Sequence, residues 1–407
     1  MVASSYPRFP GDTVGTFMEP IARGLASRGH DVHMVLPWHP RWARSHRDGG
    51  VTFHLFRYAP VPALNVFGYA GSLEADERLR GAAIAATPLA AAAGWRAARA
   101  VARQVDATVM HGHWVVPGGV LAAAAAGTRP LVISLHGSDV FVAEKHALVG
   151  RAARWAFEKA AYVTACSEDL RVRATGLGAS HERSRTIPYG VDSTRFKPDR
   201  DARFRMRAKW GVSQDDELVL GVGRFVRKKG FEFLLEAVAR LAPGRPRLRL
   251  VLAGDGDLRR EFEQRVAEHG IGDRVVMPGV LLQDEVAAAL AAADVIAVPS
   301  VKDPSGNVDG LPNVVLEALA SGTALVACPA GGIGAVVRHE ETGLLVGESD
   351  PAGLASAVAR LLDDRALSAR IGAAARRWAE SAGTWERAID AFDEVYKIAC
   401  RRSNGRA

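Results

Sequence analysis

The sequence has few of the features that mark secreted, metal-bound or membrane-spanning proteins. It contains only three cysteines in 407 residues, and their wide separation gives neither a disulfide pair nor the close spacing of a zinc site. This usage favours a reducing cytoplasm. No run of 18 apolar residues exists, so we expect no membrane span. The segment Met1–Pro10 lacks a cationic start and an apolar stretch, and we expect no signal peptide there.

Charge is distributed unevenly along the chain. Residues 1–190 contain 21 Lys and Arg against 14 Asp and Glu, which leaves 31 of each kind in the remainder of the totals of 52 and 45. Ten of the 12 histidines also lie in the first half. A basic first half and a neutral second half suggest different partners for the two halves. Arginines spread unevenly over solvated helices explain the same numbers equally well.

Short apolar segments alternate with longer helical patterns, which predicts an α/β fold with parallel sheets. Most of these segments are continuously apolar, as is typical of strands covered on both faces. The expected strands are Asp31–Leu36, Thr52–Arg57, Thr108–His111, Leu131–Leu135 and Tyr162–Ala165, followed by Leu218–Val222, Leu248–Ala253, Arg274–Met277, Val295–Val298, Ala324–Ala327 and Gly343–Val346.

The alternation pauses once, in a stretch rich in turn-forming and charged residues. We therefore predict a doubly wound domain over 1–190, a linker over 191–215 and a second doubly wound domain over 216–383. The last helix, within 384–407, has no strand after it and is expected to cross back to the first domain. Two such Rossmann-like domains would face each other across a cleft at the carboxyl ends of their strands, where ligands bind.

The strongest local pattern runs from Asp309 to Glu317. Pro312 stands where a helix can begin, and Gly322 is a good C-terminal stop. Free N–H groups at the helix start would suit an anion such as a diphosphate. Glu317 is the only charged residue of an otherwise apolar helix, and a buried carboxylate needs donors such as sugar or ribose hydroxyls. A solvent-facing glutamate is the alternative interpretation.

A second pattern joins a buried strand to a helix through a glycine turn that holds four cations. The turn contains Gly223, Arg224, Arg227, Lys228 and Lys229. Arginine grips phosphate oxygens with a fork, and lysine acts as a point charge. The turn is neither a P-loop nor a dinucleotide fingerprint, because G-x-x-x-x-G-K-[ST] is absent and G-x-G-x-x-G fails at Val226. Taken alone, it could equally be a solvated basic loop.

Two further segments of the first half are candidates for ligand contact. His136 follows the apolar strand Leu131–Leu135 and would point into the predicted cleft, although a lone histidine is often structural. His111 and His113, at another strand end, are weaker candidates. The loop Gly11–Gly15 has two glycines that would let backbone approach a ligand.

One acidic pair resembles a metal-binding motif in its spacing. Asp255-Gly256-Asp257 has the Asp-x-Asp spacing of metal-dependent sugar transferases, but we interpret it as a strand–helix turn in which Asp257 caps the next helix. The histidines show no metal-ligand spacing either. We therefore expect no metal site and no cofactor.

Taken together, these residues resemble the retaining glycosyltransferases of family 4, which have the two-domain GT-B fold. The resemblance covers nearly the whole chain. It is carried by Gly11–Gly15, His111-Gly-His113-Trp114, Pro117-Gly118, His136-Gly-Ser-Asp139, Ser167-Glu168, Ile187-Pro-Tyr-Gly-Val-Asp192, Gly223-Arg224, Lys229-Gly230, Gly254-Asp-Gly256, Asp309-Gly310 to Glu317-Ala318, Gly331-Gly332 and Thr342-Gly-Leu-Leu-Val346.

The resemblance implies a role for each site residue. The family's Glu-x7-Glu element maps onto Asp309, which would face the donor sugar, and Glu317, which would hold the ribose hydroxyls. Arg224 and Lys229 would neutralise the diphosphate leaving group, and His136 would contact the donor sugar. The other residues implied at the donor site are Gly15, Gly223, Gly279, Val280, Leu281, Gly310, Leu311, Pro312 and Asn313, with Gly279–Leu281 near the base.

The implied reaction moves a sugar from a nucleotide-diphosphate donor to a hydroxyl acceptor, with retention and without a metal or a protein nucleophile. Asn313 after Gly-Leu-Pro favours a lipid-linked or oligosaccharide acceptor in surface polysaccharide synthesis. We expect a cytoplasmic protein, and its basic first domain suggests peripheral association with an anionic inner membrane. No nucleic acid partner is expected. A sugar-nucleotide epimerase of the same fold and a non-catalytic donor-binding subunit are the alternatives.

Three departures from the family pattern stand out. Asp309 replaces the usual first glutamate and shortens its reach by one methylene. Ala335 stands where the family has a glutamate after Gly-Gly. The first strand has only Met1–Ser4 before its loop, fewer than the roughly 5–6 residues of a typical strand.

Overall fold

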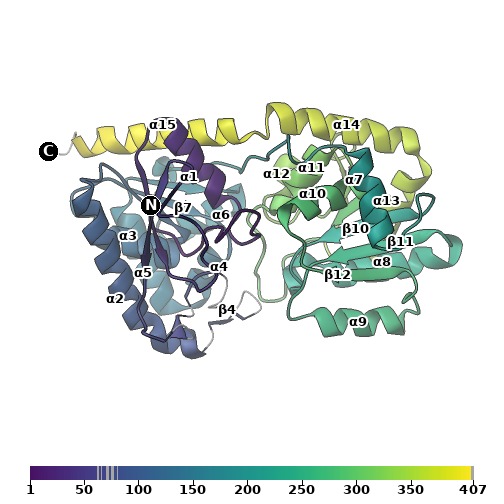
Figure 1. Cartoon of the computed structure of the whole chain (residues 1–407), viewed down its shortest axis with the longest axis horizontal. Helices are drawn as coiled ribbons and strands as arrows, with labels where there is room; N and C mark the ends of the chain where they lie inside the picture. Colours follow the sequence, from purple (N-terminus) through teal and green to yellow (C-terminus); the bar gives the residue numbers. More distant parts are fainter. Residues whose placement is uncertain (62–63, 66, 70–72, 75–77, 80, 405–407) are drawn as a thin grey trace. The chain divides into compact units, whose positions relative to one another are not determined.

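The computed structural model describes the chain except for residues 62–63, 66, 70–72, 75–77, 80 and 405–407 (Figure 1). The chain forms two compact units. The first unit comprises Met1–Tyr189 and Trp385–Ala407, and the second comprises Gly190–Thr384. Each unit is built around a mainly parallel sheet with helices on its faces.

The sheet of the first unit is completed at its centre by a single residue. Val2 bridges β1 (Val32–Pro37) and β6 (Met110–His113), and its N–H donates to the His111 carbonyl at 2.8 Å. The expected first strand is thus reduced to a single bridging residue, Val2. The flanking strands are β2 (Arg47–Asp48) and β3 (Val51–Phe56) on one side, and β7 (Leu131–Leu135), β8 (Tyr162–Ala165) and β9 (Ser184–Thr186) on the other.

Helices cover this sheet, and the last helix of the chain is one of them. Helix α15 (Trp385–Asn404) packs against α1 (Met18–Ser27), and its Phe392 and Val395 share one apolar core with Met18. The other helices are α2 (Gly81–Gln104), α3 (Val120–Ala126), α4 (Ser138–Lys145), α5 (Ala147–Lys159) and α6 (Glu168–Gly176). The strands β4 (Leu73–Glu74) and β5 (Arg78–Leu79) pair antiparallel with each other. No described helix is sufficiently long and apolar to cross a membrane.

The second unit has six parallel strands in the order β12-β11-β10-β13-β14-β15. They are β10 (Glu217–Val222), β11 (Leu248–Ala253), β12 (Val275–Gly279), β13 (Val295–Val298), β14 (Ala324–Ala327) and β15 (Leu344–Leu345). The order reverses between β10 and β13, so the segments that follow Val222 and Val298 lie at the switch point where doubly wound sheets bind ligands.

Helices flank the second sheet as well. They are α7 (Arg200–Lys209), α8 (Phe231–Leu241), α9 (Arg259–Glu268), α10 (Gln283–Ala292), α11 (Asn313–Ser321), α12 (Ile333–Val336), α13 (Pro351–Asp363) and α14 (Arg365–Ser381). The core lies between the sheet and helices such as α8 and α13, where Leu234, Leu252 and Val358 are buried together.

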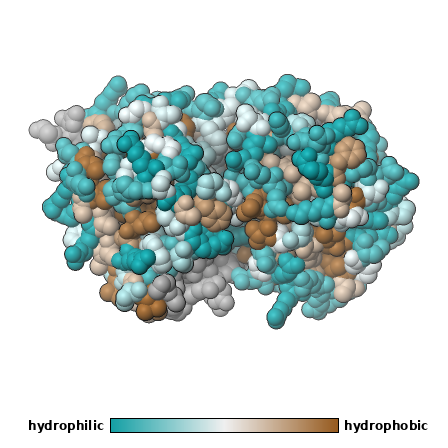
Figure 2. Space-filling view, viewed as in Figure 1, coloured by the Kyte–Doolittle hydropathy of each residue, from teal (hydrophilic) through white to brown (hydrophobic). Residues whose placement is uncertain are grey.

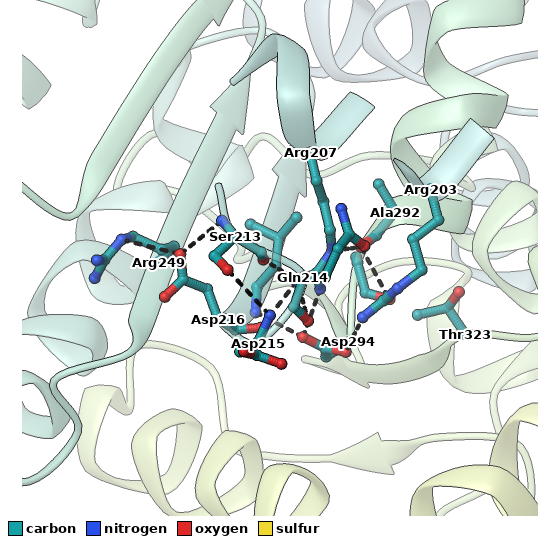
Figure 3. Close-up of polar contacts among 12 residues, drawn as sticks. Arg203, Arg207, Ser213, Gln214, Asp215, Asp216, Arg249, Ala292, Asp294 and Thr323 are labelled. Carbon is teal, nitrogen blue, oxygen red and sulfur yellow. Dashed lines mark hydrogen bonds and ion pairs between the residues drawn. The ribbon is translucent and has the colours of Figure 1, made fainter. Parts of the chain in front are cut away.

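The segment 191–215, expected as a linker, contains α7 and is anchored in the second unit (Figure 3). Arg207 is fully buried and donates to the Asp294 carboxylate at 2.7 Å and to the Ala292 carbonyl at 2.9 Å. Asp294 also accepts from Arg203 and from the Leu218 N–H, both at 2.8 Å. This buried ion pair, with its hydrogen bonds satisfied, lets a highly charged segment fold against the sheet.

Candidate functional site

Two loops of the second unit are held tightly against each other at the carboxyl ends of β10 and β13. Gly230 has a φ of +64°, and a Cβ there would collide with the Pro299 carbonyl oxygen. The Val301 N–H also donates to the Lys228 carbonyl at 3.0 Å. The basic turn after β10 is therefore locked to the segment that leads from β13 towards Asp309.

Two lysines of this turn contact one carboxylate. The Lys229 Nζ donates to Asp309 Oδ2 at 2.5 Å, and the Lys228 Nζ lies 3.2 Å from Asp309 Oδ1. All three side chains are largely buried, and Lys228 is the most buried of them. Burial would raise the pKa of Asp309, but Lys229, Lys228 and Arg224 outweigh it and hold this pKa well below its ordinary value. Asp309 is therefore ionised at neutral pH.

The four cations predicted in this turn do not act together. Arg227 points to α9, where it donates to both carboxylate oxygens of Glu261. Arg224 is exposed and influences the pKa of Asp309 electrostatically. The structure thus brings Arg224, Lys228 and Lys229 towards Asp309 and assigns Arg227 to an ion pair elsewhere.

Asp309 is also held by its main chain. A Cβ at Gly331, whose φ is +58°, would collide with the Asp309 carbonyl oxygen. The Gly332 N–H donates to the Gly310 carbonyl at 2.7 Å. Ala335, at the position of the family glutamate, lies exposed on α12.

Helix α11 begins at Asn313, directly after Pro312, and ends at Gly322 in the left-handed conformation. Its residues are buried apart from Asn313 and Glu317, which are partly exposed. No described residue forms a hydrogen bond or an ion pair with the Glu317 carboxylate. Burial raises the pKa of Glu317 to about 7, and the positive charge of Arg195 opposes this shift. This is the lone carboxylate on an apolar helix that the sequence predicted.

The segment Gly279–Leu281 lies at the same edge of the sheet, because it follows the parallel strand β12. Gly279 has a φ of +84°, and its carbonyl accepts from the Gly254 N–H at 2.8 Å. Val280 is 62% exposed, whereas Leu281 is buried. An exposed apolar residue beside a glycine turn offers a surface against which a planar ring can pack.

The acidic pair Asp255 and Asp257 differs from the sequence interpretation. Helix α9 starts at Arg259 with Leu258 at its N-cap and has no side-chain cap, so the capping role expected of Asp257 is wrong. Within the described part of the chain, no three His, Cys, Asp or Glu side chains are grouped to hold a metal ion.

In the first unit, the structure places His136 after β7 with both ring nitrogens engaged. Nδ1 hydrogen-bonds the Tyr189 hydroxyl at 2.6 Å, and Nε2 hydrogen-bonds His113 Nδ1 at 3.0 Å. Phe17 packs against the ring with a centroid distance of 4.6 Å. Burial lowers the pKa of His136 to about 3, so the imidazole is neutral at pH 7.

The weaker candidates behave differently from His136. His111 is buried between the Tyr396 hydroxyl of α15 and the Ser134 hydroxyl, each at 2.6 Å, which makes it part of the interior. His113 contacts His136. Gly15, with a φ of +65°, accepts from the Met18 N–H and precedes Phe17 by two residues, so its loop reaches the surroundings of His136.

Sequence reasoning missed two residues. Lys228 was counted among the cations, but no pattern indicated that it contacts Asp309. Tyr189 lies in the Ile187–Asp192 motif, and its bond to His136 joins segments 53 positions apart. Each residue lies within a segment that the sequence analysis singled out, and this position is the only signal that the sequence offers.

Comparison with known proteins identifies the family. The model described as Glycosyltransferase Family 4 matches residues 14–195, and that of Glycosyl transferases group 1 matches residues 202–378. A 2-deoxystreptamine glucosyltransferase of Streptomyces kanamyceticus is 32% identical over 65% of this chain and 69% of the relative. A GDP-mannose-dependent alpha-(1-6)-phosphatidylinositol monomannoside mannosyltransferase of Mycolicibacterium smegmatis is 34% identical over 64% and 68%.

Solved structures agree on the fold. Anabaena HepE in complex with UDP-glucose superposes with a TM-score of 0.75 over 97% of this chain and 98% of that one, at 20% identity. WaaG, a glycosyltransferase of lipopolysaccharide biosynthesis, gives 0.69 over 97% and 99%, also at 20% identity. The architecture is therefore GT-B, with two Rossmann-like domains. The chain belongs to the group 1 glycosyltransferases of family 4, which transfer a sugar from a nucleotide-sugar donor.

Proposed function

We propose that the chain is a retaining, metal-independent hexosyltransferase whose donor binds along Asp309–Glu317. The observation that carries the proposal is the Glu317 carboxylate, which is partly buried on an apolar helix and receives no hydrogen bond from the described residues. Ribose hydroxyls would supply the missing donors. The start of the same helix offers N–H groups to the diphosphate, and Lys229 lies beside Asp309 in the adjoining loop.

In this proposal the protein acts through charge stabilisation. Lys229, Arg224 and the N–H groups at the start of α11 stabilise the negative charge that develops on the departing diphosphate. Asp309 faces the donor sugar, and the acceptor hydroxyl attacks on the face from which the diphosphate leaves. His136 contacts the sugar as a neutral ring. It is not the general base, because a group with a pKa of about 3 accepts a proton poorly at pH 7.

We expect activity to persist in EDTA. The cations that face the diphosphate are side chains, and the described acidic residues form no cluster for a divalent ion. Release of nucleoside diphosphate should be equal, within about twofold, with EDTA and with manganese. Complete loss in EDTA and recovery with manganese would instead revive Asp255 and Asp257 as metal ligands.

The names of the relatives support a proposal for the donor sugar and the acceptor of this chain. Their names include glucosyl and mannosyl transfer and a phosphatidylinositol-linked acceptor. Together with Asn313 after Gly-Leu-Pro, this supports a hexose donor and a lipid-linked or oligosaccharide acceptor for this chain.

Incubation with donor alone distinguishes the epimerase alternative from a transferase, because an epimerase makes a new sugar nucleotide and a transferase does not. Donor binding without turnover on any acceptor extract would indicate a non-catalytic subunit.

A lipid-linked acceptor implies contact with a membrane, and the first unit has a suitable surface. Helix α2 contains three arginines and no acidic residue, and it exposes Leu89 and Trp95. Helix α5 exposes Leu148 and Trp155 together with cations. Helix α3 packs against both helices. In Figure 2, hydrophobic and hydrophilic residues adjoin at the lower left, where α2 runs in Figure 1. Exposed apolar side chains beside cations, as on each of these two helices, suit anionic lipids.

We expect Leu148→Gln/Trp155→Gln to lower binding to phosphatidylglycerol-containing vesicles at least tenfold, measured by co-sedimentation. Removing two exposed apolar side chains forfeits their insertion among the lipids. The matched control is Phe204→Gln, an exposed aromatic residue under Arg200 on α7 of the second unit, which should leave binding unchanged. Equal binding of the double variant and wild type would refute the proposal that this surface binds the membrane.

A further inference from the structure

Two arginines of the first unit are held by aromatic rings and not by carboxylates. The guanidinium carbon of Arg57 lies 3.7 Å from the centroid of the Trp38 ring, and that of Arg41 lies 5.4 Å from the centroid of Phe9. Both arginines are exposed, and neither guanidinium has a hydrogen-bond or ion-pair partner among the described residues. A ring that covers the face of a guanidinium leaves its N–H edge open, so each fork of donors is held in place without being used.

Neighbouring arginines are used differently. Arg8 donates through Nε and Nη2 to the two carboxylate oxygens of Asp12, at 2.6 and 2.8 Å. Arg44 is buried and donates to two further carboxylates. The forks of these two arginines are already filled within the unit. By contrast, Arg41 and Arg57 keep donors that an incoming anion can engage.

The two aromatic-held arginines lie along one segment. Trp38 follows β1 directly, and its N–H donates to the last carbonyl of β3 at 2.9 Å, which brings Arg57 beside it. Arg41 lies three positions after Trp38, and its main-chain N–H donates to His39 Nδ1 at 3.1 Å. Burial, and then the positive charges of Arg8 and Arg41, lower the pKa of His39, as expected where cations gather.

This segment and His136 lie at the same edge of the first sheet. Strands β1 and β7 run parallel and are separated by Val2 and β6, so three spacings of roughly 4.8 Å place their ends about 14 Å apart. One loop spans the interval: its Phe9 lies against Arg41, and its Phe17 packs on the His136 ring at 4.6 Å. A molecule that reaches from His136 to the two arginines is therefore longer than one sugar ring.

We propose that Arg41 and Arg57 bind a phosphate group of the acceptor, attached at least one sugar ring away from the hydroxyl that receives the donor sugar. Phosphate oxygens match the forked donors of arginine, and two guanidinium groups balance the charge of a phosphate. A lipid headgroup and a soluble sugar phosphate share this chemistry. The inference rests on the proposed function, because it gives the acceptor of that reaction a charged group for recognition.

The test is calorimetric titration of the full chain in the presence of UDP and GDP, which occupy the proposed donor site. Glucose 1-phosphate and mannose 1-phosphate should bind at least tenfold more tightly than glucose and mannose, and Arg41→Gln/Arg57→Gln should remove this preference. Arg41→Lys/Arg57→Lys keeps the charges without the forks and should retain part of it. Dihexanoyl phosphatidylinositol is the lipid probe: tighter binding than the sugar phosphates indicates a lipid headgroup, and binding no tighter indicates a soluble phosphate.

The matched control is Arg47→Gln, which should bind every probe as wild type does. Arg47 is also exposed and without a described partner for its guanidinium, but it lies on β2 beside the start of β3, at the opposite edge of the sheet. A wild type that does not prefer any phosphorylated probe, or an undiminished preference in the glutamine double variant, would overturn the inference.

Titration with UDP and GDP alone separates this inference from the proposed donor site. Their affinity should stay within about twofold of wild type in the glutamine double variant, and a larger loss would show that the two arginines do not act on the acceptor alone. If the wild type binds neither nucleotide, the donor site is misplaced. The phosphate preference, and its loss in a double variant with a wild-type melting temperature, would still assign the anion to Arg41 and Arg57.

Discussion

Replacing Lys229 with methionine is expected to lower kcat/KM for the nucleotide sugar by about 100- to 1,000-fold. Loss of one preorganised group that stabilises developing transition-state charge has this order of effect. Lys229 lies 2.5 Å from Asp309, which precedes the first residue of α11 by four positions, so we expect this cation to meet the leaving diphosphate. Methionine preserves most of the side-chain length while removing the charge.

The effect is measured from initial rates of nucleoside diphosphate release at subsaturating donor. Lys397→Met serves as the matched control, because it makes the same substitution at an exposed lysine of α15, and it should leave kcat/KM unchanged. Asp309 keeps Lys228 in the variant, so we expect a folded protein with a cooperative melting transition. A variant whose kcat/KM stays within threefold of wild type would remove Lys229 from the proposed mechanism.

Two substitutions of Glu317 test its roles in activity and in stability separately. Glu317→Ala is expected to cost at least tenfold in rate, or about 1.4 kcal/mol, because the ribose loses its acceptor. Glu317→Gln keeps the shape of the side chain and removes the charge. At pH 8 we expect it to raise the free energy of unfolding by about 1–3 kcal/mol, since the wild-type carboxylate is partly buried without a hydrogen-bond donor.

The stability effect has a defined pH dependence. The folded-state pKa of Glu317 is raised from 4.5 to about 7, so the folded protein binds this proton more tightly than the unfolded chain does. The stability of the wild type should therefore fall as the pH rises from about 4.5 to 7 and then level off. Glu317→Gln lacks this contribution, and the difference between the two unfolding curves isolates it. Parallel curves for wild type and variant would show that Glu317 is ionised normally.

Parts of the fold were predictable because their signal is local. Strands such as Leu131–Leu135 and Leu248–Ala253 are continuously apolar and end where a turn begins, so their limits in the structure equal those expected from sequence. The first strand could not be judged from its length, since Val2 is held from both sides by β1 and β6.

The candidate site was predictable only in part, because its contacts are long-range. The chemistry of Glu317 is visible in the apolar residues around it on one helix. By contrast, nothing near Arg227 indicates that Glu261, 34 positions away, will take it out of the basic turn. The bond from His113 to His136 likewise exists only because β6 and β7 are neighbours in the sheet. Composition supplied the cations, and the tertiary fold decided which of them face Asp309.

The most direct measurement of the central claim is a crystal structure of the wild-type chain with a bound nucleoside diphosphate. We predict the ribose hydroxyls on the Glu317 carboxylate, and the diphosphate between Lys229 and the N–H groups that begin α11, with no metal ion between protein and phosphate. A diphosphate bound elsewhere, or one bridged by a divalent cation to Asp255 and Asp257, would contradict the account.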